Sequence, residues 1–203
     1  MQPFTIHHGK VAPLDRANVD TDQIIPKQFL KRIERTGFGE FLFYDWRRGQ
    51  DGQPDPSFTL NQARYKGASI LVAGKNFGCG SSREHAVWAL EDFGFRSVIA
   101  SSFADIFSNN CLQNGVLALV LDETEVNEIM RRAAEFPDYR LTIDLEQRKV
   151  KDDHGFSANF KIEETTRHRL LNGLDDIGLT LIQKSDIAAY ERAHPVPSAS
   201  KQL

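Results

Sequence analysis

The chain has 203 residues, of which 40% are hydrophobic and 26% charged, as is typical of a globular protein with a sizeable core. Its formal net charge of −3 argues against nucleic acid as the main partner, because nucleic-acid-binding domains are as a rule strongly basic. No apolar run approaches the roughly 20 residues of a membrane span. The N-terminus has no basic segment followed by an apolar one, so we expect no secretory signal and a cytoplasmic protein.

The first third of the chain combines one expected strand with irregular polar and aromatic segments. Residues 4–12 predict a strand that ends at Pro13. Residues 15–28 contain three aspartates but not the glycine and glutamate of a calcium loop, so we expect a turn held by aspartate side chains. Residues 38–48 predict a helix whose aromatic rings pack in the core, and residues 49–57 predict an exposed loop.

The most informative segment is a glycine-rich loop between an apolar run over 68–73, expected to be a buried strand, and a helical pattern over 84–94. Ser81, Ser82 and Arg83 lie where this helix begins. The unpaired N–H groups and partial positive charge of a helix start favour a carboxylate or phosphate. A structural interpretation is also open, because serine is a favoured N-cap. Arginine, however, is unfavourable at a helix start unless an anion or acidic partner compensates its charge.

The pattern then alternates between buried strands and helices, with strands expected at 97–100 and 116–121 and helices at 103–113 and 124–136. This alternation predicts parallel strands with right-handed crossovers. Residues 139–162 predict a β-hairpin, and residues 163–193 return to helical spacing. We expect one domain over residues 1–194 and a disordered polar tail over 195–203.

The two cysteines, Cys79 and Cys111, cannot by themselves hold an iron–sulfur cluster or a cysteine-rich zinc site. Cys79 lies in the glycine loop, and we interpret it as a small packing residue because the sequence places no histidine near it as a base. His85 follows within the helix and is interpreted as a structural residue. The chain is therefore expected to bind no metal.

Four segments carry a resemblance to a known family: residues 18–26, 76–85, 101–110 and 173–181. They resemble the small subunits of bacterial 3-isopropylmalate dehydratases, and the Gly-Ser-Ser-Arg-Glu-His run at 80–85 is similar to a motif of the whole aconitase superfamily. The resemblance implies the aconitase swivelling-domain fold. That fold is a three-layer α/β arrangement with a mixed or parallel sheet, flanking helices and, in this chain, a C-terminal hairpin.

The resemblance also implies an activity and a partner. The activity is that of a hydro-lyase of leucine biosynthesis, which interconverts 2-isopropylmalate and 3-isopropylmalate by dehydration and rehydration. The implied partner is a large subunit that carries a [4Fe–4S] cluster, so this chain would bind no cofactor and be active only in the heterodimer. The substrate would be a small dicarboxylate, and neither nucleic acid nor a membrane would take part.

Site residues follow from the same resemblance, carried over position by position. Ser81 would remove the substrate proton, although a free serine is a weak base and needs its alkoxide stabilised by the helix start and Arg83. Ser82 and Arg83 would hold a substrate carboxylate. Thr21 and Asp22 would belong to the hydrogen-bond network of the active site.

A further substrate-binding arginine is implied shortly after the early polar loop. The spacing departs from that of aconitase, so Lys31, Arg32 and Arg35 all stay open as candidates, with Arg32 assigned to the role. The alternative interpretation of these charges is a solvated face. Leu30 is expected to meet the isopropyl group, and Phe29 is apolar in the same segment.

Three alternatives remain at this point. The chain could be the small subunit of a related homoaconitase or of a methylmalate (citraconate) hydro-lyase. It could be a nucleotide-binding oxidoreductase, although the third glycine and the acidic residue of a dinucleotide fingerprint are missing. It could also be a regulatory or assembly subunit that only binds an anion.

Overall fold

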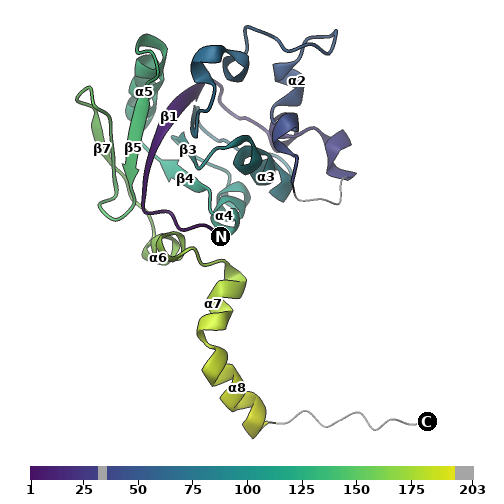
Figure 1. Ribbon diagram of the computed structural model, residues 1–203, viewed down its shortest axis with the longest axis vertical. Coiled ribbons are helices and arrows are strands. Elements are labelled where there is room, and N and C mark those ends of the chain that lie inside the picture. Colours follow the sequence, from purple (N-terminus) through teal and green to yellow (C-terminus); the bar gives the residue numbers. More distant parts are fainter. Residues whose placement is uncertain (32–35, 195–203) are drawn as a thin grey trace.

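The computed structural model describes residues 1–31 and 36–194 and is organised around a seven-stranded sheet in the order β4-β3-β2-β1-β5-β6-β7 (Figure 1). The strands are β1 (Ile6–Leu14), β2 (Ile70–Ala73), β3 (Ser97–Ala100), β4 (Leu117–Val120), β5 (Arg140–Asp144), β6 (Lys149–Lys151) and β7 (Ser157–Asn159). β1 to β4 are parallel, whereas β5, β6 and β7 pair antiparallel. The predicted mixed sheet is confirmed.

Strand β1 continues through Pro13, so the prediction that it ends there is wrong. The N–H of Val11 bonds to the carbonyl of Tyr139, on the β5 side of the strand. Alternation along the strand turns the nitrogen of Pro13 to this same side, where the pairing with β5 has ended at Lys10. The missing N–H of proline therefore costs no ladder bond, and Pro13 still pairs in register with Val72 of β2.

The predicted strand–helix alternation is confirmed. Helix α3 (Glu84–Phe93) joins β2 to β3, and α4 (Asp105–Asn114) joins β3 to β4. Gly94 and Gly115 end these helices with φ of 115° and 75°, values that glycine adopts without steric cost. Helix α5 (Glu123–Glu135) follows β4 and begins with a capping box at Asp122.

The helices cover both faces of the sheet and give the three layers that the resemblance implied. Because successive side chains of a strand point to opposite faces, Leu71 packs into the core shared with α3 and α4, whereas Ile70 packs into the core shared with α5. Leu170 of α6 (Glu164–Asn172) adds to this second core. Figure 1 shows α3 and α4 on one side of the parallel strands and α5 on the other.

The aromatic segment does not form the single helix predicted over 38–48. It is divided into a 3-10 turn, Gly39–Phe41, and the short helix α2 (Tyr44–Arg47), because Phe43 between them is left-handed with φ of 49°. The N–H of Phe43 donates to the carbonyl of Ile24, and its ring is fully buried. The expectation that these aromatics belong to the core is confirmed for Phe38 and Phe43.

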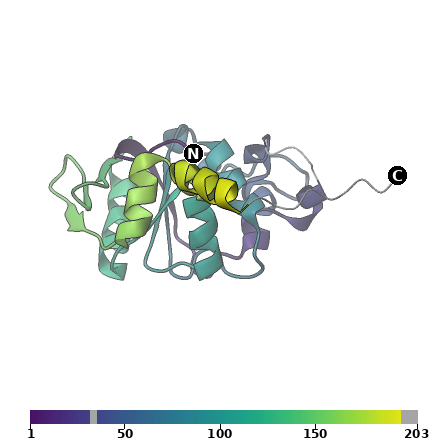
Figure 2. The same cartoon turned by 90° about the horizontal axis from the view of Figure 1, so that it is seen from below.

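The C-terminal part contains the predicted hairpin, β6 and β7, extended by β5 into a three-stranded meander. Beyond α6, helices α7 (Asp176–Ile182) and α8 (Lys184–Ala193) have no buried residue. Figure 1 shows this pair projecting from the body, and Figure 2 shows α8 in front of it. No helix within the described residues is both long and apolar enough to cross a membrane. The predicted tail, 195–203, lies outside the described residues.

Candidate functional site

A cavity of about 240 Å³ opens at the carboxyl ends of β2 and β3, where loops of α/β sheets commonly bind ligands. One wall of the cavity is the glycine loop and the start of α3, and the other wall is the first half of α4. The cavity as a whole is lined by Thr21, Gly78, Gly80, Ser81, Ser82, Arg83, Ala104, Asp105, Ile106, Phe107 and Asn110.

Backbone hydrogen bonds join the two loops that form these walls. The N–H of Phe77 donates to the carbonyl of Ser102 at 3.1 Å, and the N–H of Ala104 donates back to the carbonyl of Phe77 at 3.1 Å. A third segment joins them, because Asp20 and Cys79 form a parallel bridge. Three segments distant in sequence therefore meet at one edge of the sheet.

Glycine is required where the loop approaches its neighbours. At Gly80, with φ of 87°, an added Cβ would lie 2.0 Å from Oδ2 of Asp20. At Gly78, with φ of 76°, it would lie 2.1 Å from the ring of Phe107. Both positions combine a backbone that disfavours other residues with contacts shorter than any side chain tolerates. The two glycines therefore set how closely the loop lies against α4 and the Asp20 turn.

Thr21 lies beside Ser81, but its hydroxyl serves the loop backbone. Its Oγ1 donates to the carbonyl of Ser81 at 2.7 Å, and its N–H donates to the carbonyl of Cys79 at 2.9 Å. Only 2% of Thr21 is exposed. It begins α1 (Thr21–Ile24), which Asp20 caps together with Gln23, so the expected aspartate-held turn is present. Thr21 thereby holds the backbone that carries the Ser81 side chain.

Asp22 and Arg83 form an ion pair, between Oδ1 of the carboxylate and Nη1 of the guanidinium. The Arg83 side chain is only 10% exposed, and Lys27 approaches the other oxygen of Asp22 at 3.7 Å. In the chain by itself, Asp22 is therefore the acidic partner that compensates the charge of Arg83 at the helix start. The pair orients Arg83 at the cavity wall.

Arg83, rather than a serine, occupies the N-cap position of α3, and its side chain makes no capping hydrogen bond. The structural interpretation of Ser81 and Ser82 as helix caps is therefore wrong. Both residues are exposed and line the cavity just before the helix. Their hydroxyl groups are accordingly placed for a ligand in the cavity.

Of the remaining predicted site residues, those that the structure describes do not line this cavity. Leu30 is half-buried, packs against the core on the side of α3 and α4, and is not among the lining residues. Phe29 stacks on Phe41, with ring centroids 4.0 Å apart. Arg32 and its alternative Arg35 lie outside the described residues.

The α4 wall contributes residues for which the sequence predicted no role. Asp105, Ile106 and Asn110 all line the cavity, and Ile106 is 54% exposed. They lie in one of the four segments that carry the family resemblance. The signal for them was the predicted parallel pairing of adjacent strands, because loops that follow neighbouring parallel strands meet at the same edge.

Cys79 and His85 are poorly suited to nucleophilic or base chemistry. Burial and the nearby Asp20 carboxylate raise the pKa of the Cys79 thiol, so the reactive thiolate is disfavoured. The His85 ring lies 4.6 Å from Trp88 and 5.4 Å from Phe38, and burial lowers its pKa. Within the described residues, no three histidine, cysteine or acidic side chains are grouped to hold a metal ion.

Comparisons with known proteins place these features in a family. A family model described as the Aconitase C-terminal domain matches residues 1–124, and a second, described as LeuD_N, matches residues 127–164. The chain is 61% identical over 194 residues to a 3-isopropylmalate dehydratase small subunit from Geobacillus kaustophilus, covering 96% of this chain and 98% of the relative.

Further similarities are of the same kind. A protein with the same name from Koribacter versatilis is 62% identical over 194 residues, covering 96% of this chain and 100% of the relative. A solved structure of 3-isopropylmalate dehydratase from Methanocaldococcus jannaschii has a TM-score of 0.66 and covers 91% of this chain and 99% of that chain. It is 24% identical, and at that level the likeness concerns the fold.

Proposed function

Because the chain belongs to the family of 3-isopropylmalate dehydratase small subunits, we propose that it completes the active site of a hydro-lyase that interconverts 2-isopropylmalate and 3-isopropylmalate. The reaction removes water to give an unsaturated dicarboxylate and adds it back with the opposite orientation. Membership of this family excludes the alternative of a nucleotide-binding oxidoreductase. The assay described below distinguishes 2-isopropylmalate from the related substrates homoaconitate and methylmalate.

The observation that carries this proposal is the arrangement around the cavity. Two exposed hydroxyls, Ser81 and Ser82, and the guanidinium of Arg83 meet at the N-terminal end of α3. The N-terminal end of α4 forms the opposite wall. Helix N-termini and a guanidinium together favour a carboxylate, and a dicarboxylate substrate supplies two.

Ser81 is the proposed proton acceptor. Its alkoxide would take the proton from the carbon next to a substrate carboxylate, and the electron pair of that C–H bond would form the double bond. The hydroxyl group on the neighbouring carbon would leave with its bonding electron pair and take a proton from solvent to become water. Ser81 would return the proton it accepted to solvent, which restores the alkoxide. The N–H groups at the start of α3 and the charge of Arg83 would stabilise the alkoxide, and Thr21 would hold the Ser81 backbone in place.

Ser82 and Arg83 are the proposed carboxylate ligands. A guanidinium has five N–H donors in a planar fork, so its pairing with Asp22 through Nη1 orients the group for a second carboxylate. Leu30 and Arg32 stay in the proposal as residues that approach the substrate from the segment between α1 and α2. Their contribution would require that segment to lie over the cavity.

The donor set of this chain does not fit an iron–sulfur cluster. Cys79 is half-buried in the loop, Cys111 is fully buried on α4, and the described residues group no other soft ligands around them. We therefore propose that the [4Fe–4S] cluster belongs to the large subunit, and that this chain contributes the carboxylate site and the proton acceptor. The complex would work in the cytoplasm, without nucleic acid or a membrane.

The test is to co-express the chain with a cluster-bearing large subunit of the same family and to assay 2-isopropylmalate, 2-methylmalate and homoaconitate. We expect conversion only when both subunits are present, and the highest kcat/KM with 2-isopropylmalate. A stable complex that prefers one of the other substrates would contradict the isopropylmalate assignment. A complex that converts none of them would contradict the hydro-lyase itself.

A further inference from the structure

We infer that Ile106 of α4 contacts the alkyl group of the substrate. The inference rests on the proposed function and deepens it, because it locates substrate specificity on the wall opposite Ser81. It adds to the proposed role of Leu30, which in the chain by itself packs against the core and is not among the cavity-lining residues.

Ile106 differs from the other exposed apolar residues by its position. Large hydrophobic side chains that are exposed in the described chain are Ile6, Ile106, Val120, Ile177, Leu181, Ile182, Ile187 and Tyr190. Of these, only Ile106 lines the cavity that contains Ser81, Ser82 and Arg83. An exposed isoleucine at the rim of a carboxylate site is costly in water and becomes favourable when an apolar group of the ligand covers it.

The position of Ile106 is fixed by its neighbour in sequence. Phe107 is buried and its ring packs edge-on against Phe77, with centroids 5.3 Å apart. It also packs over Gly78, where no other residue would fit. The first turn of α4 is thereby held against the glycine loop, so the Ile106 side chain is presented at a constant distance from the loop.

The cavity offers both kinds of contact that an alkyl-substituted dicarboxylate needs. The α3 wall offers hydroxyls, N–H groups and Arg83, which suit carboxylates. The α4 wall combines the polar Asp105 and Asn110 with Ile106, whose exposed side chain suits a branched alkyl group. Malate carries the same two carboxylates without the alkyl group, so its binding should not depend on Ile106.

The experiment compares Ile106→Ala and Ile106→Met with wild type in the assembled two-subunit enzyme. The readouts are kcat and KM for 2-isopropylmalate and the inhibition constant of malate in the same assay. We expect Ile106→Ala to raise KM for 2-isopropylmalate about tenfold, because few apolar contacts remain for the isopropyl group. The inhibition constant of malate should stay within about twofold, and Ile106→Met should restore most of the affinity.

The matched control is Ile6→Ala, which removes the same atoms from an isoleucine that is 61% exposed on β1 and does not line the cavity. It should leave all three constants unchanged. The inference is overturned if Ile106→Ala leaves KM unchanged, or if KM and the malate constant rise together. It is also overturned if the variant loses activity because the large subunit no longer co-elutes in size-exclusion chromatography. If wild type itself does not convert 2-isopropylmalate, the proposed function fails first.

Discussion

At the scale of single residues, Ser81 is held by its backbone while its side chain faces the cavity. Thr21 binds its carbonyl, and the N-cap of α3 is Arg83, so the Ser81 hydroxyl has no structural duty at the helix start. We therefore expect Ser81→Ala to lower turnover of the assembled enzyme at least about 10²-fold, with little change in melting temperature. Incorporation of solvent deuterium into isopropylmalate should fall by the same factor as net conversion.

A suitable control is Ser157→Ala, an exposed serine on β7 at the far end of the sheet, which should change neither measurement. Normal deuterium incorporation in Ser81→Ala, with a melting temperature lowered by the loss of a cap, would contradict the assignment of Ser81 as proton acceptor.

Gly80 tests how strictly the loop must approach the Asp20 turn. Gly80→Ala would combine a left-handed backbone, costing about 1 kcal/mol, with a Cβ that has no room beside the Asp20 carboxylate. Gly52→Ala isolates the first effect, because Gly52 has φ of 75° and nothing within 4 Å of an added Cβ. We expect Gly80→Ala to lose clearly more free energy of unfolding than Gly52→Ala, measured by urea denaturation. Equal losses of unfolding free energy in the two variants would show that the loop can move away from Asp20 without destabilising the protein.

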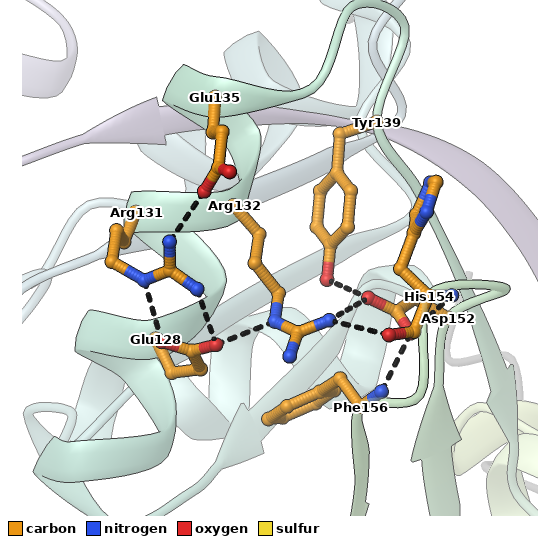
Figure 3. A network of polar contacts seen from close by, with 8 residues as sticks. All are labelled: Glu128, Arg131, Arg132, Glu135, Tyr139, Asp152, His154 and Phe156. Atoms are coloured by element: carbon orange, nitrogen blue, oxygen red, sulfur yellow. Dashed lines mark hydrogen bonds and ion pairs between the residues drawn. The ribbon is translucent and has the colours of Figure 1, made fainter.

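At the scale of elements, a polar network ties the β6–β7 turn to α5 and to the segment before β5 (Figure 3). The Asp152 carboxylate has no exposed area and accepts from Tyr139 at 2.8 Å and from Arg132 at 3.0 Å. It also accepts backbone N–H bonds from His154 and Phe156. Arg132 is bound in turn by Glu128 on the same helix, so one buried carboxylate joins three parts of the chain.

Replacement of this carboxylate should be costly, because several donors lose their acceptor at once. We expect Asp152→Asn to lower the free energy of unfolding at pH 7 by about 2–3 kcal/mol. Asp153→Asn, on the exposed neighbour, should stay within about 0.5 kcal/mol of wild type. Urea titrations of both variants provide the measurement. Similar losses of unfolding free energy in the two variants would show that the buried network stabilises the protein no more than an exposed carboxylate does.

Because Asp152 titrates, the difference in stability between wild type and Asp152→Asn should depend on pH. Burial by itself raises the pKa of Asp152, but the hydrogen bonds from Tyr139, Phe156, His154 and Arg132 outweigh it, so its pKa lies below the ordinary value. A depressed pKa contributes stability that is fully present above the unfolded value of about 3.9 and is lost as pH falls through the folded value. The difference between wild type and Asp152→Asn should therefore shrink below about pH 4.

At the scale of the whole molecule, the helices α7 and α8 form an arm that adds no residue to either core. Its link to the body is polar: Asp176 accepts from Gln113 at 2.6 Å and from Arg169 at 2.8 Å. The preceding helix α6 differs, because Leu170 is buried and its carbonyl accepts the N–H of Phe4. The body is thus complete at the end of α6.

A chain ending at Asp175 should therefore melt within about 4 °C of the full chain, since about 1 kcal/mol corresponds to 2–4 °C at this size. A chain ending at Glu163 also loses Leu170 and should be strongly destabilised. Calorimetry gives the melting temperatures of both truncations, and calorimetry of the full chain tests the prediction of one domain over residues 1–194, which requires a single transition. An equal loss of stability in the two truncations would show that the arm is part of the body's core.

Local signals in the sequence determined the parallel strands and their helices. The apolar run before the glycine loop became β2, and Gly94 and Gly115 ended the helices as predicted, because these signals act between near neighbours in the chain. The Ser-Ser-Arg run was found for the same reason. Family resemblance added the fold, whose layers the structure confirms.

Tertiary contacts decided the rest. The predicted aromatic helix breaks at Phe43 because the distant Ile24 carbonyl captures its N–H, and β1 passes through Pro13 because its partner strand has already ended. The ion pair of Asp22 with Arg83 joins residues that are 61 positions apart, and the cavity places Ile106 opposite Ser81, 25 positions away. Their meeting depends on which strands pair and in which register, and pairing is a property of the whole sheet rather than of any one segment.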